Sequence, residues 1–282
     1  MQLIELNDNL IFLDPDTDPY IDANVGSGLL GQNEPAFLSA GVQTNTYDVG
    51  HVFTNPCVDV GGVVNGRACS NGKMRGVTCV GNNIEATAVR VMAHEIGHQF
   101  ACGHSWDNCP NSAEQRSGAN AYEPGSGTTI MSYSGTCGDQ NIANTTDDYY
   151  NIGSLQTFYA FSRDVNPNCG TLTPNGNNAP EVIIPMEGGF TIPSRTPFEL
   201  TAEGSDIDGD PITYCWEQHD LSTIPSSIGQ PTGDAPIFRS RRPTTNPTRI
   251  FPTLNSILAN SCLLYTSPSP RDRTRSRMPS SA

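Results

Sequence analysis

The apolar residues of this 282-residue chain fall into helix-like and strand-like stretches. Between residues 85 and 100 they cover enough of a helical repeat to predict a buried helix, the members being Ala86, Val89, Val91, Met92, Ala93, Ile96 and Phe100. We expect this helix to end just before Gly103, because glycine permits the reversal that follows a helix. Upstream, residues 52–54 and 75–80 are predicted strands, and residues 1–14 are expected to form an internal strand of the same sheet.

Beyond residue 170 the pattern changes to short β-prone runs bounded by Pro, Gly and Asp, which lie at residues 182–184, 198–202 and 212–217. Residues 171–178 (TLTPNGNN) are polar and contain Pro and Gly, which indicates a linker. The sequence therefore predicts a first domain over residues 1–170. A smaller all-β module, an immunoglobulin-like sandwich that we expect to be incomplete, follows over residues 179–261.

The last 21 residues, 262–282, differ from the acidic chain before them, since they carry Arg271, Arg273, Arg275 and Arg277. One interpretation is a basic tail for nucleic acid or an anionic surface. We favour another, in which the run resembles a translated sequencing adaptor fused to a truncated gene and is disordered. Without it the formal net charge changes from −14 to −17, because four Arg and Asp272 leave.

Composition favours an extracellular protein. The net charge of −14, with Lys73 as the single lysine, argues against nucleic-acid binding. Nine cysteines predict disulfides and an oxidising compartment. No stretch approaches the roughly 20 apolar residues that span a bilayer. No signal peptide is recognisable either, because residues 2–6 are strand-like, so we expect an N-terminally truncated fragment.

Seven of the cysteines lie at or before Cys169, and Cys215 stands alone in the second module. An odd number in the first domain leaves one cysteine unpaired there, or paired with a residue missing from the fragment. Our best single pairing is Cys109 with Cys137, since the two flank the segment that carries the chemistry.

That chemistry is concentrated at His94-Glu95-Ile96-Gly97-His98, followed six residues later by His104. Positions i and i+4 lie on one face of a helix, so His94 and His98 can reach the same metal ion. Three neutral imidazoles suit Zn²⁺, and Glu95, about 100° round the helix, can hydrogen-bond a zinc-activated water. The alternative without a function is a surface helix whose histidines bind no metal.

A second motif, Thr129-Ile130-Met131-Ser132-Tyr133, has its methionine 27 residues beyond His104. With it the chain resembles the metzincin peptidases, in which a Met-turn lies beneath a three-histidine zinc site. Residues 121–133 (AYEPGSGTTIMSY) and 147–150 (DDYY), ahead of a short helix around residues 154–161, resemble the reprolysin-like branch of secreted bacterial proteins.

The resemblance covers most of residues 1–170 and implies a metzincin-type catalytic domain of the α+β or α/β class, with a twisted mixed sheet and an active-site helix. It implies that Met131 packs beneath the zinc without binding it. Tyr133 occupies a position where some metzincins place a tyrosine on the metal or the oxyanion. A packed, hydrogen-bonded aromatic is the equally weighted alternative for Tyr133.

The chain departs from the metzincin pattern at Ala101, where a glycine is usual. If that position has positive φ, alanine costs roughly 1 kcal/mol or more. Gly103 is then a candidate to take over the turn, and Cys102 a candidate to pin it through a disulfide. The local path to His104 is therefore the weak point of the prediction.

The implied function is that of a secreted zinc metalloendopeptidase acting on proteins or peptides, with Glu95 as general base and the substrate extended along a sheet edge. Two alternatives stay open. One is a catalytically inactive binding or adhesion protein that keeps the fold. The other is an HExxH hydrolase whose third ligand is a glutamate, such as Glu114 or Glu123, against which His104 and the Met-turn argue.

A calcium ion is a second candidate cofactor, at Asp206, Asp208 and Asp210. The stretch superficially matches an EF-hand loop, with Glu217 twelfth from Asp206, but Pro211 replaces the sixth-position glycine and excludes that motif. A weaker calcium site in an acidic turn of a cadherin-like or immunoglobulin-like repeat is the remaining hypothesis, and a solvated turn is its alternative.

Overall fold

The computed structural model describes residues 2–81, 89–171, 173–185, 189–193 and 196–259. The chain divides into two compact units, one of Met1–Cys102 with Leu155–Leu172 and one of Gly103–Ser154 with Thr173–Ala282. The predicted limits of the linker, the all-β module and the first domain remain predictions.

The first unit is built on a mixed three-stranded sheet in the order β1-β3-β2. Its strands are β1 (Val52–Thr54), β2 (Gly62–Val64) and β3 (Gly76–Cys79). β1 pairs with β3 in parallel, and β2 pairs with β3 in antiparallel fashion. The predicted strands at residues 52–54 and 75–80 are confirmed, and the order makes β2 one edge of the sheet.

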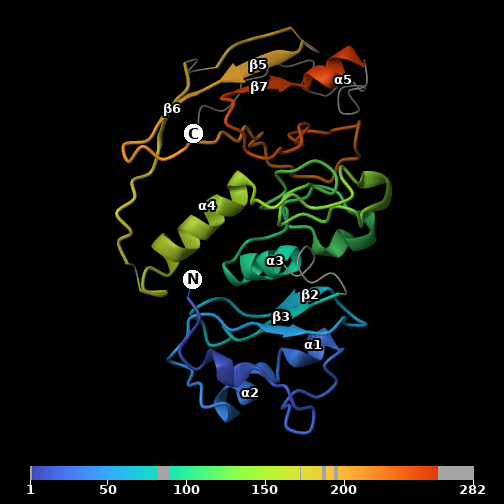
Figure 1. Cartoon of the computed structure of the whole chain (residues 1–282). Coiled ribbons are helices and arrows are strands. Elements are labelled where there is room, and N and C mark those ends of the chain that lie inside the picture. Colours follow the sequence, from blue (N-terminus) through green and yellow to red (C-terminus); the bar gives the residue numbers. More distant parts are fainter. Residues whose placement is uncertain (1, 82–88, 172, 186–188, 194–195, 260–282) are drawn as a thin grey trace. The chain divides into compact units, whose positions relative to one another are not determined.

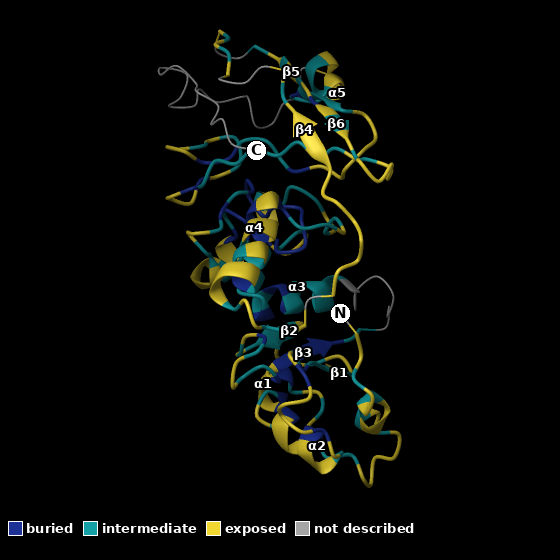
Figure 2. Ribbon diagram, turned by 90° about the vertical axis from the view of Figure 1, so that its left-hand side faces the viewer, coloured by how far each residue is buried: buried dark blue, intermediate teal, exposed yellow. Residues whose placement is uncertain are grey.

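Helix α3 (Val89–Gln99) packs on one face of this sheet, and α1 (Gly26–Leu29) packs on the other, with α2 (Asn33–Ser39) beyond it (Figure 1). Because both faces are covered, every residue of β3 is buried (Figure 2). The predicted helix is confirmed over residues 89–99 and ends before Gly103 as expected, while Ala86 and the predicted start at residue 85 lie outside the described residues.

The expected strand over residues 1–14 is wrong for the part that the structure describes. Residues 2–14 contain a 3₁₀ helix, η1 (Asn7–Leu10), and no strand. The polar side chains of an Asn-Asp-Asn run favour local turns over a strand ladder. Ile4 and Leu10 instead pack against a buried cluster of Phe37, Val42, Tyr47 and Met74.

Two disulfides close loops in the first unit, Cys57–Cys79 and Cys69–Cys169. The short helix predicted near residues 154–161 is confirmed as α4 (Ile152–Ala160), which continues into a π-helical turn, η5 (Phe161–Val165). Phe158 and Phe161 place their ring centroids 5.3 and 5.7 Å from that of Phe100, directly after α3.

In the second unit, residues 103–154 are mostly turns, with two 3₁₀ helices, η3 (Pro110–Gln115) and η4 (Gly138–Gln140). The predicted disulfide Cys109–Cys137 is confirmed. It packs against Trp106 and Tyr133, so this cross-link supports the segment that follows His104.

In the rest of the described second unit, the regular elements are two antiparallel strand pairs and one short helix, α5 (Leu254–Leu258), joined by loops. β4 (Glu181–Ile183) pairs with β6 (Glu203–Ser205), and β5 (Phe198–Thr201) pairs with β7 (Thr248–Phe251). Two of the predicted β-prone runs thus form strands. The third, residues 212–217, forms only a single bridge between Tyr214 and Thr244. The Glu217 side chain at its end accepts from Asn151 and from the N–H of Ile152.

Residues 260–282, which include the suspected adaptor-derived tail, lie outside the described residues. Among the described residues, no helix has both the length and the apolar character needed to cross a membrane.

Candidate metal centre

Helix α3 presents His94 and His98 side by side. Their ring centroids lie 4.7 Å apart, and their Nε2 atoms are separated by 3.1 Å. The spacing of four residues brings both side chains to one face of the helix, as the sequence predicts.

The chain leaves α3 through a tight turn with a hydrogen-bond pattern that normally recruits glycine. The N–H of Cys102 donates to the carbonyl of Gly97 at 2.9 Å, and the N–H of Ala101 donates to the carbonyl of His98 at 3.0 Å. This pair of bonds is a Schellman motif, and it requires a left-handed residue between them. Ala101 supplies that conformation with φ +69°, so the turn is made by the departing residue itself and not by Gly103.

Cys102 contributes a buried thiol to this turn instead of the disulfide that we considered from the sequence. Burial raises the pKa of the Cys102 thiol to about 12. The residue therefore acts in the turn through packing and through its backbone.

The same turn orients the imidazole of His98, whose Nδ1 lies 2.7 Å from the carbonyl of Cys102. In the same way Nδ1 of His104 lies 2.7 Å from the carbonyl of Gln115. A carbonyl can only accept, so each Nδ1 must be the donor and each Nε2 carries a lone pair. This is the arrangement in which histidine binds a metal through Nε2.

The structure brings the three histidines together, with one ring nitrogen each from His94, His98 and His104 within 4.8 Å of one another. Three imidazoles, of which His98 and His104 have Nδ1 held by a backbone carbonyl, fit the tetrahedral preference of Zn²⁺, with a position left for a water or substrate. The donor set therefore suits zinc.

Glu95 lies on α3 beside these histidines, with its side chain 6% exposed. Burial raises the pKa of its carboxyl to about 8. It lies against β2: a Cβ added at Gly62 would be 2.5 Å from Oε1 of Glu95. Only glycine leaves room for the carboxylate at this edge of the sheet, so β2 and α3 together determine where Glu95 lies.

Met131 is fully buried, and its carbonyl accepts a hydrogen bond from the N–H of Ser105 at 3.0 Å. Tyr133 lies with its ring centroid 4.5 Å from that of His104, and its hydroxyl donates to the side chain of Gln115. Gln115 thus binds His104 through its backbone and Tyr133 through its side chain, which is a connection that the sequence analysis missed. The role of Tyr133 at the metal remains a prediction.

Glu123, one of the alternative third ligands, is 1% exposed and accepts hydrogen bonds on both carboxylate oxygens. Its donors come from Ser105, Thr128 and Thr129. Glu114, the other alternative, is exposed on η3. Neither glutamate belongs to the cluster of ring nitrogens described above.

Gln99, the last residue of α3, was not predicted to be functional and is completely buried. Its amide donates to the carbonyls of Gly50 and Lys73 at 3.0 Å each, and its oxygen lies 3.0 Å from Nδ1 of His51. These bonds anchor the end of α3, which carries two of the three clustered histidines, to the loops that flank the sheet. Nothing in the helical pattern distinguishes this glutamine from a solvent-exposed one.

The carboxylates of Asp206, Asp208 and Asp210 also come together, with one oxygen each within 4.8 Å of the others. Oδ1 of Asp206 accepts from the N–H groups of Asp208 and Asp210, at 2.8 and 3.3 Å, and Asp208 accepts from Asn178. Backbone bonds of this kind also hold an acidic turn without an ion. The calcium site remains a prediction.

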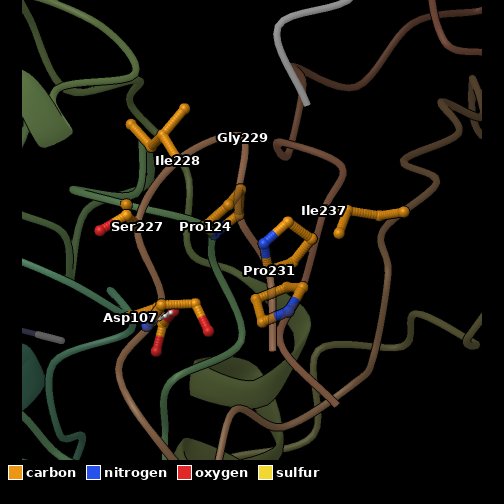
Figure 3. A pocket seen from close by; sticks show the side chains of 10 residues that line it. Asp107, Pro124, Ser227, Ile228, Gly229, Pro231 and Ile237 are labelled. Atoms are coloured by element: carbon orange, nitrogen blue, oxygen red, sulfur yellow. Dashed lines mark hydrogen bonds between the residues drawn. The ribbon is translucent and has the colours of Figure 1, made fainter. Parts of the chain in front are cut away.

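A separate small cavity in the second unit contains no histidine in its lining (Figure 3). It lies between Asp107 and Pro124 on one side and residues 226–237 on the other, and its volume of about 10 Å³ has room for about one water molecule. Asp107 there is already paired with Arg116 at 2.9 Å and accepts from the N–H of Ser226. This cavity is therefore too small, and too fully bonded, to be a substrate site.

In a comparison with protein-family models, the family described as Metallo-peptidase family M12B Reprolysin-like matches residues 1–159. The chain matches no curated protein. The matched residues contain the three histidines, Glu95 and the segment around Met131.

Proposed function

Because the chain belongs to the reprolysin-like family of M12B metallopeptidases, we propose that it is a secreted zinc endopeptidase with His94, His98 and His104 as zinc ligands and Glu95 as general base. The observation that carries the proposal is the convergence of three histidine ring nitrogens next to a buried glutamate on the same helix. Met131 would form the floor of this site.

Zinc, when bound, supplies the Lewis acidity that makes a water nucleophilic and polarises the scissile carbonyl. Glu95 would take a proton from the attacking water and return it to the leaving amine. Tyr133 would lend its hydroxyl to the developing oxyanion after leaving Gln115, to which it donates in this structure.

The substrate would bind in an extended conformation along β2, adding a strand to the sheet. β2 is favoured over β1, the other edge of the three-stranded sheet, because Gly62 of β2 lies against Glu95. A backbone bound there would have its peptide groups close to the general base.

Secretion and the immunoglobulin-like character of residues 179–261 are further parts of the proposal. Three disulfides among the described residues support an oxidising compartment. The antiparallel pairs β4–β6 and β5–β7 support an all-β module. We leave calcium binding by Asp206, Asp208 and Asp210 as a hypothesis.

The test compares the full chain with its Glu95→Gln and Glu114→Gln variants, using casein and a fluorogenic peptide mixture as substrates. We expect one zinc per chain in all three proteins. Chelation should abolish cleavage and added zinc should restore it. Glu95→Gln should cut cleavage by about 10²-fold or more, whereas Glu114→Gln, at an exposed position, should leave it unchanged.

Equal background cleavage by the wild-type chain and Glu95→Gln would remove the enzyme and favour the binding-protein alternative. His104→Ala tests the ligand set separately, because removing a ligand should lower zinc affinity. If zinc affinity is unchanged in His104→Ala but falls in Glu114→Gln or Glu123→Gln, a glutamate is favoured as the third ligand.

A further inference from the structure

Glu123 is a buried carboxylate placed between two segments of the candidate zinc site. It is 1% exposed, and none of the ion pairs among the described residues includes it. A carboxylate out of water must be satisfied by other means. The donors that satisfy it are hydroxyls and backbone N–H groups from both sides of the residue.

One donor comes from the segment that carries the third histidine. The hydroxyl of Ser105, the residue after His104, donates to Oε2 of Glu123 at 2.5 Å. The backbones of the two residues are joined as well, because the N–H of Glu123 donates to the carbonyl of Ser105 at 2.9 Å. The position of the chain directly after His104 is therefore tied to Glu123 through both side chain and backbone.

The remaining donors come from the Met-turn. The N–H groups of Thr128 and Thr129 donate to Oε1 of Glu123 at 2.9 and 3.2 Å, and the Thr129 hydroxyl donates to Oε2 at 2.5 Å. The Thr128 hydroxyl lies 3.3 Å from Oε1. These two threonines precede Met131 by two and three residues, so the carboxylate holds the turn that leads into the floor of the site.

Gly127 shows how closely the turn wraps the carboxylate. Its φ is +65°, and an added Cβ would lie 3.1 Å from Oε2 of Glu123 and 2.8 Å from Cβ of Ser132. The loop 123–129 is thus folded around the Glu123 side chain. Beside it, the N–H of Ser105 donates directly to the carbonyl of Met131 at 3.0 Å.

We propose that Glu123 is a positioning residue for the metal centre, which fixes the segment of His104 and the Met-turn against each other through Ser105, Thr128 and Thr129. This rests on the proposed function, in that it takes His104 to be a zinc ligand. A glutamine at position 123 would have the same size but would present N–H donors to N–H and hydroxyl donors. The segment of His104 and the Met-turn would then be held less firmly against each other, although Glu123 itself does not contact the metal.

The test measures metal affinity of the full chain and of Glu123→Gln by chelator competition with Zn²⁺, and records the visible absorption spectrum after loading with Co²⁺. We expect zinc affinity to fall about 10- to 100-fold, the range found when groups that orient metal ligands are removed. The Co²⁺ bands should shift, because they report the geometry of the ligands around the ion.

Glu217→Gln is the matched control. Glu217 is a carboxylate in the same unit that also accepts from a backbone N–H, that of Ile152 at 2.7 Å, and from Asn151 at 3.1 Å. It makes no hydrogen bond to Ser105, Thr128 or Thr129. Its substitution should leave zinc affinity within about twofold and the Co²⁺ spectrum unchanged.

Ser105→Ala keeps the test decisive if Glu123→Gln does not fold, because it deletes one hydroxyl and leaves the carboxylate with its four donors from Thr128 and Thr129. It should weaken zinc binding by a factor of a few. In the double variant the loss should equal that of Glu123→Gln alone, since the two groups act through one hydrogen bond.

The outcomes separate the two proposals. If the wild-type chain binds no zinc, the proposed function fails. If the wild-type chain binds zinc and cleaves peptides while Glu123→Gln and Ser105→Ala bind zinc with the same affinity and the same Co²⁺ spectrum, the positioning role of Glu123 is overturned and the function stands.

Discussion

Replacing Ala101 by glycine should stabilise the folded chain. Ala101 holds φ +69° at the end of α3, within the Schellman turn made by Cys102 and Gly97. A side chain with a Cβ costs about 1–2 kcal/mol in this conformation. Glycine removes that cost, but it also stabilises the unfolded chain by about 0.5–1 kcal/mol through greater backbone freedom. The net expectation is a gain of about 0.5–1 kcal/mol.

Ala160→Gly provides the control of opposite sign. Ala160 ends α4 with φ −59° and ψ −44°, which is ordinary right-handed helix. Glycine there relieves no strain and adds unfolded-state entropy, so it should destabilise by about 0.5–1 kcal/mol. The same chemical change is therefore expected to separate the two variants by about 1–2 kcal/mol.

The assay is equilibrium unfolding in urea, followed by far-ultraviolet circular dichroism, with zinc present and with a chelator. The midpoint should move up for Ala101→Gly and down for Ala160→Gly, with unchanged m-values. Zinc affinity of Ala101→Gly should be retained, because the Cys102 carbonyl still accepts from His98. A loss of stability in Ala101→Gly as large as that in Ala160→Gly would refute the argument from backbone strain.

Two further substitutions test the surroundings of the site. Gly62→Ala places a methyl group 2.5 Å from Oε1 of Glu95 and should cut kcat by up to about 100-fold with zinc retained. Gly61→Ala, with nothing within 4 Å of an added Cβ, should leave kcat unchanged. Equal kcat values in the two variants would contradict the contact between Gly62 and Glu95. For Glu217, burial raises the carboxyl pKa, so the folded chain holds this proton more tightly and its stability falls as pH rises above the ordinary glutamate value. Glu217→Gln should remove that slope, which unfolding curves between pH 4 and 8 would reveal; parallel pH profiles for variant and wild type would count against it.

The proximity of His94 and His98 could be predicted from the sequence because it depends only on local helical spacing. The four-residue spacing of His94 and His98 becomes a shared face in any α-helix, whatever the rest of the fold does. The position of His104 required more, namely a reversal after the helix. The positive φ at Ala101 shows that the backbone follows the geometry usual for glycine even though the residue there is alanine.

The strands were predictable only where burial dictates them. β3 is buried along its whole length, and its apolar run was recognised. In residues 2–14 the Asn-Asp-Asn run favours a turn over a strand. Residues 212–217 have the composition of a strand but form only one bridge among the described residues, since pairing is decided by distant segments. β2 was not predicted, because it begins with Gly62, a residue of low strand propensity. Glycine is needed there by the close approach of Glu95.

Glu123 marks the limit of reading chemistry from residue type. A carboxylate near a zinc motif is a candidate ligand, and the sequence alone offers no way to tell a ligand from an acceptor for nearby N–H groups. The structure separates the two, because Glu123 receives hydrogen bonds from Thr128, Thr129 and Ser105 on both of its oxygens. With its lone pairs so engaged, the residue can act on the metal only through the segments it joins, and that is why zinc affinity is the quantity that tests its positioning role.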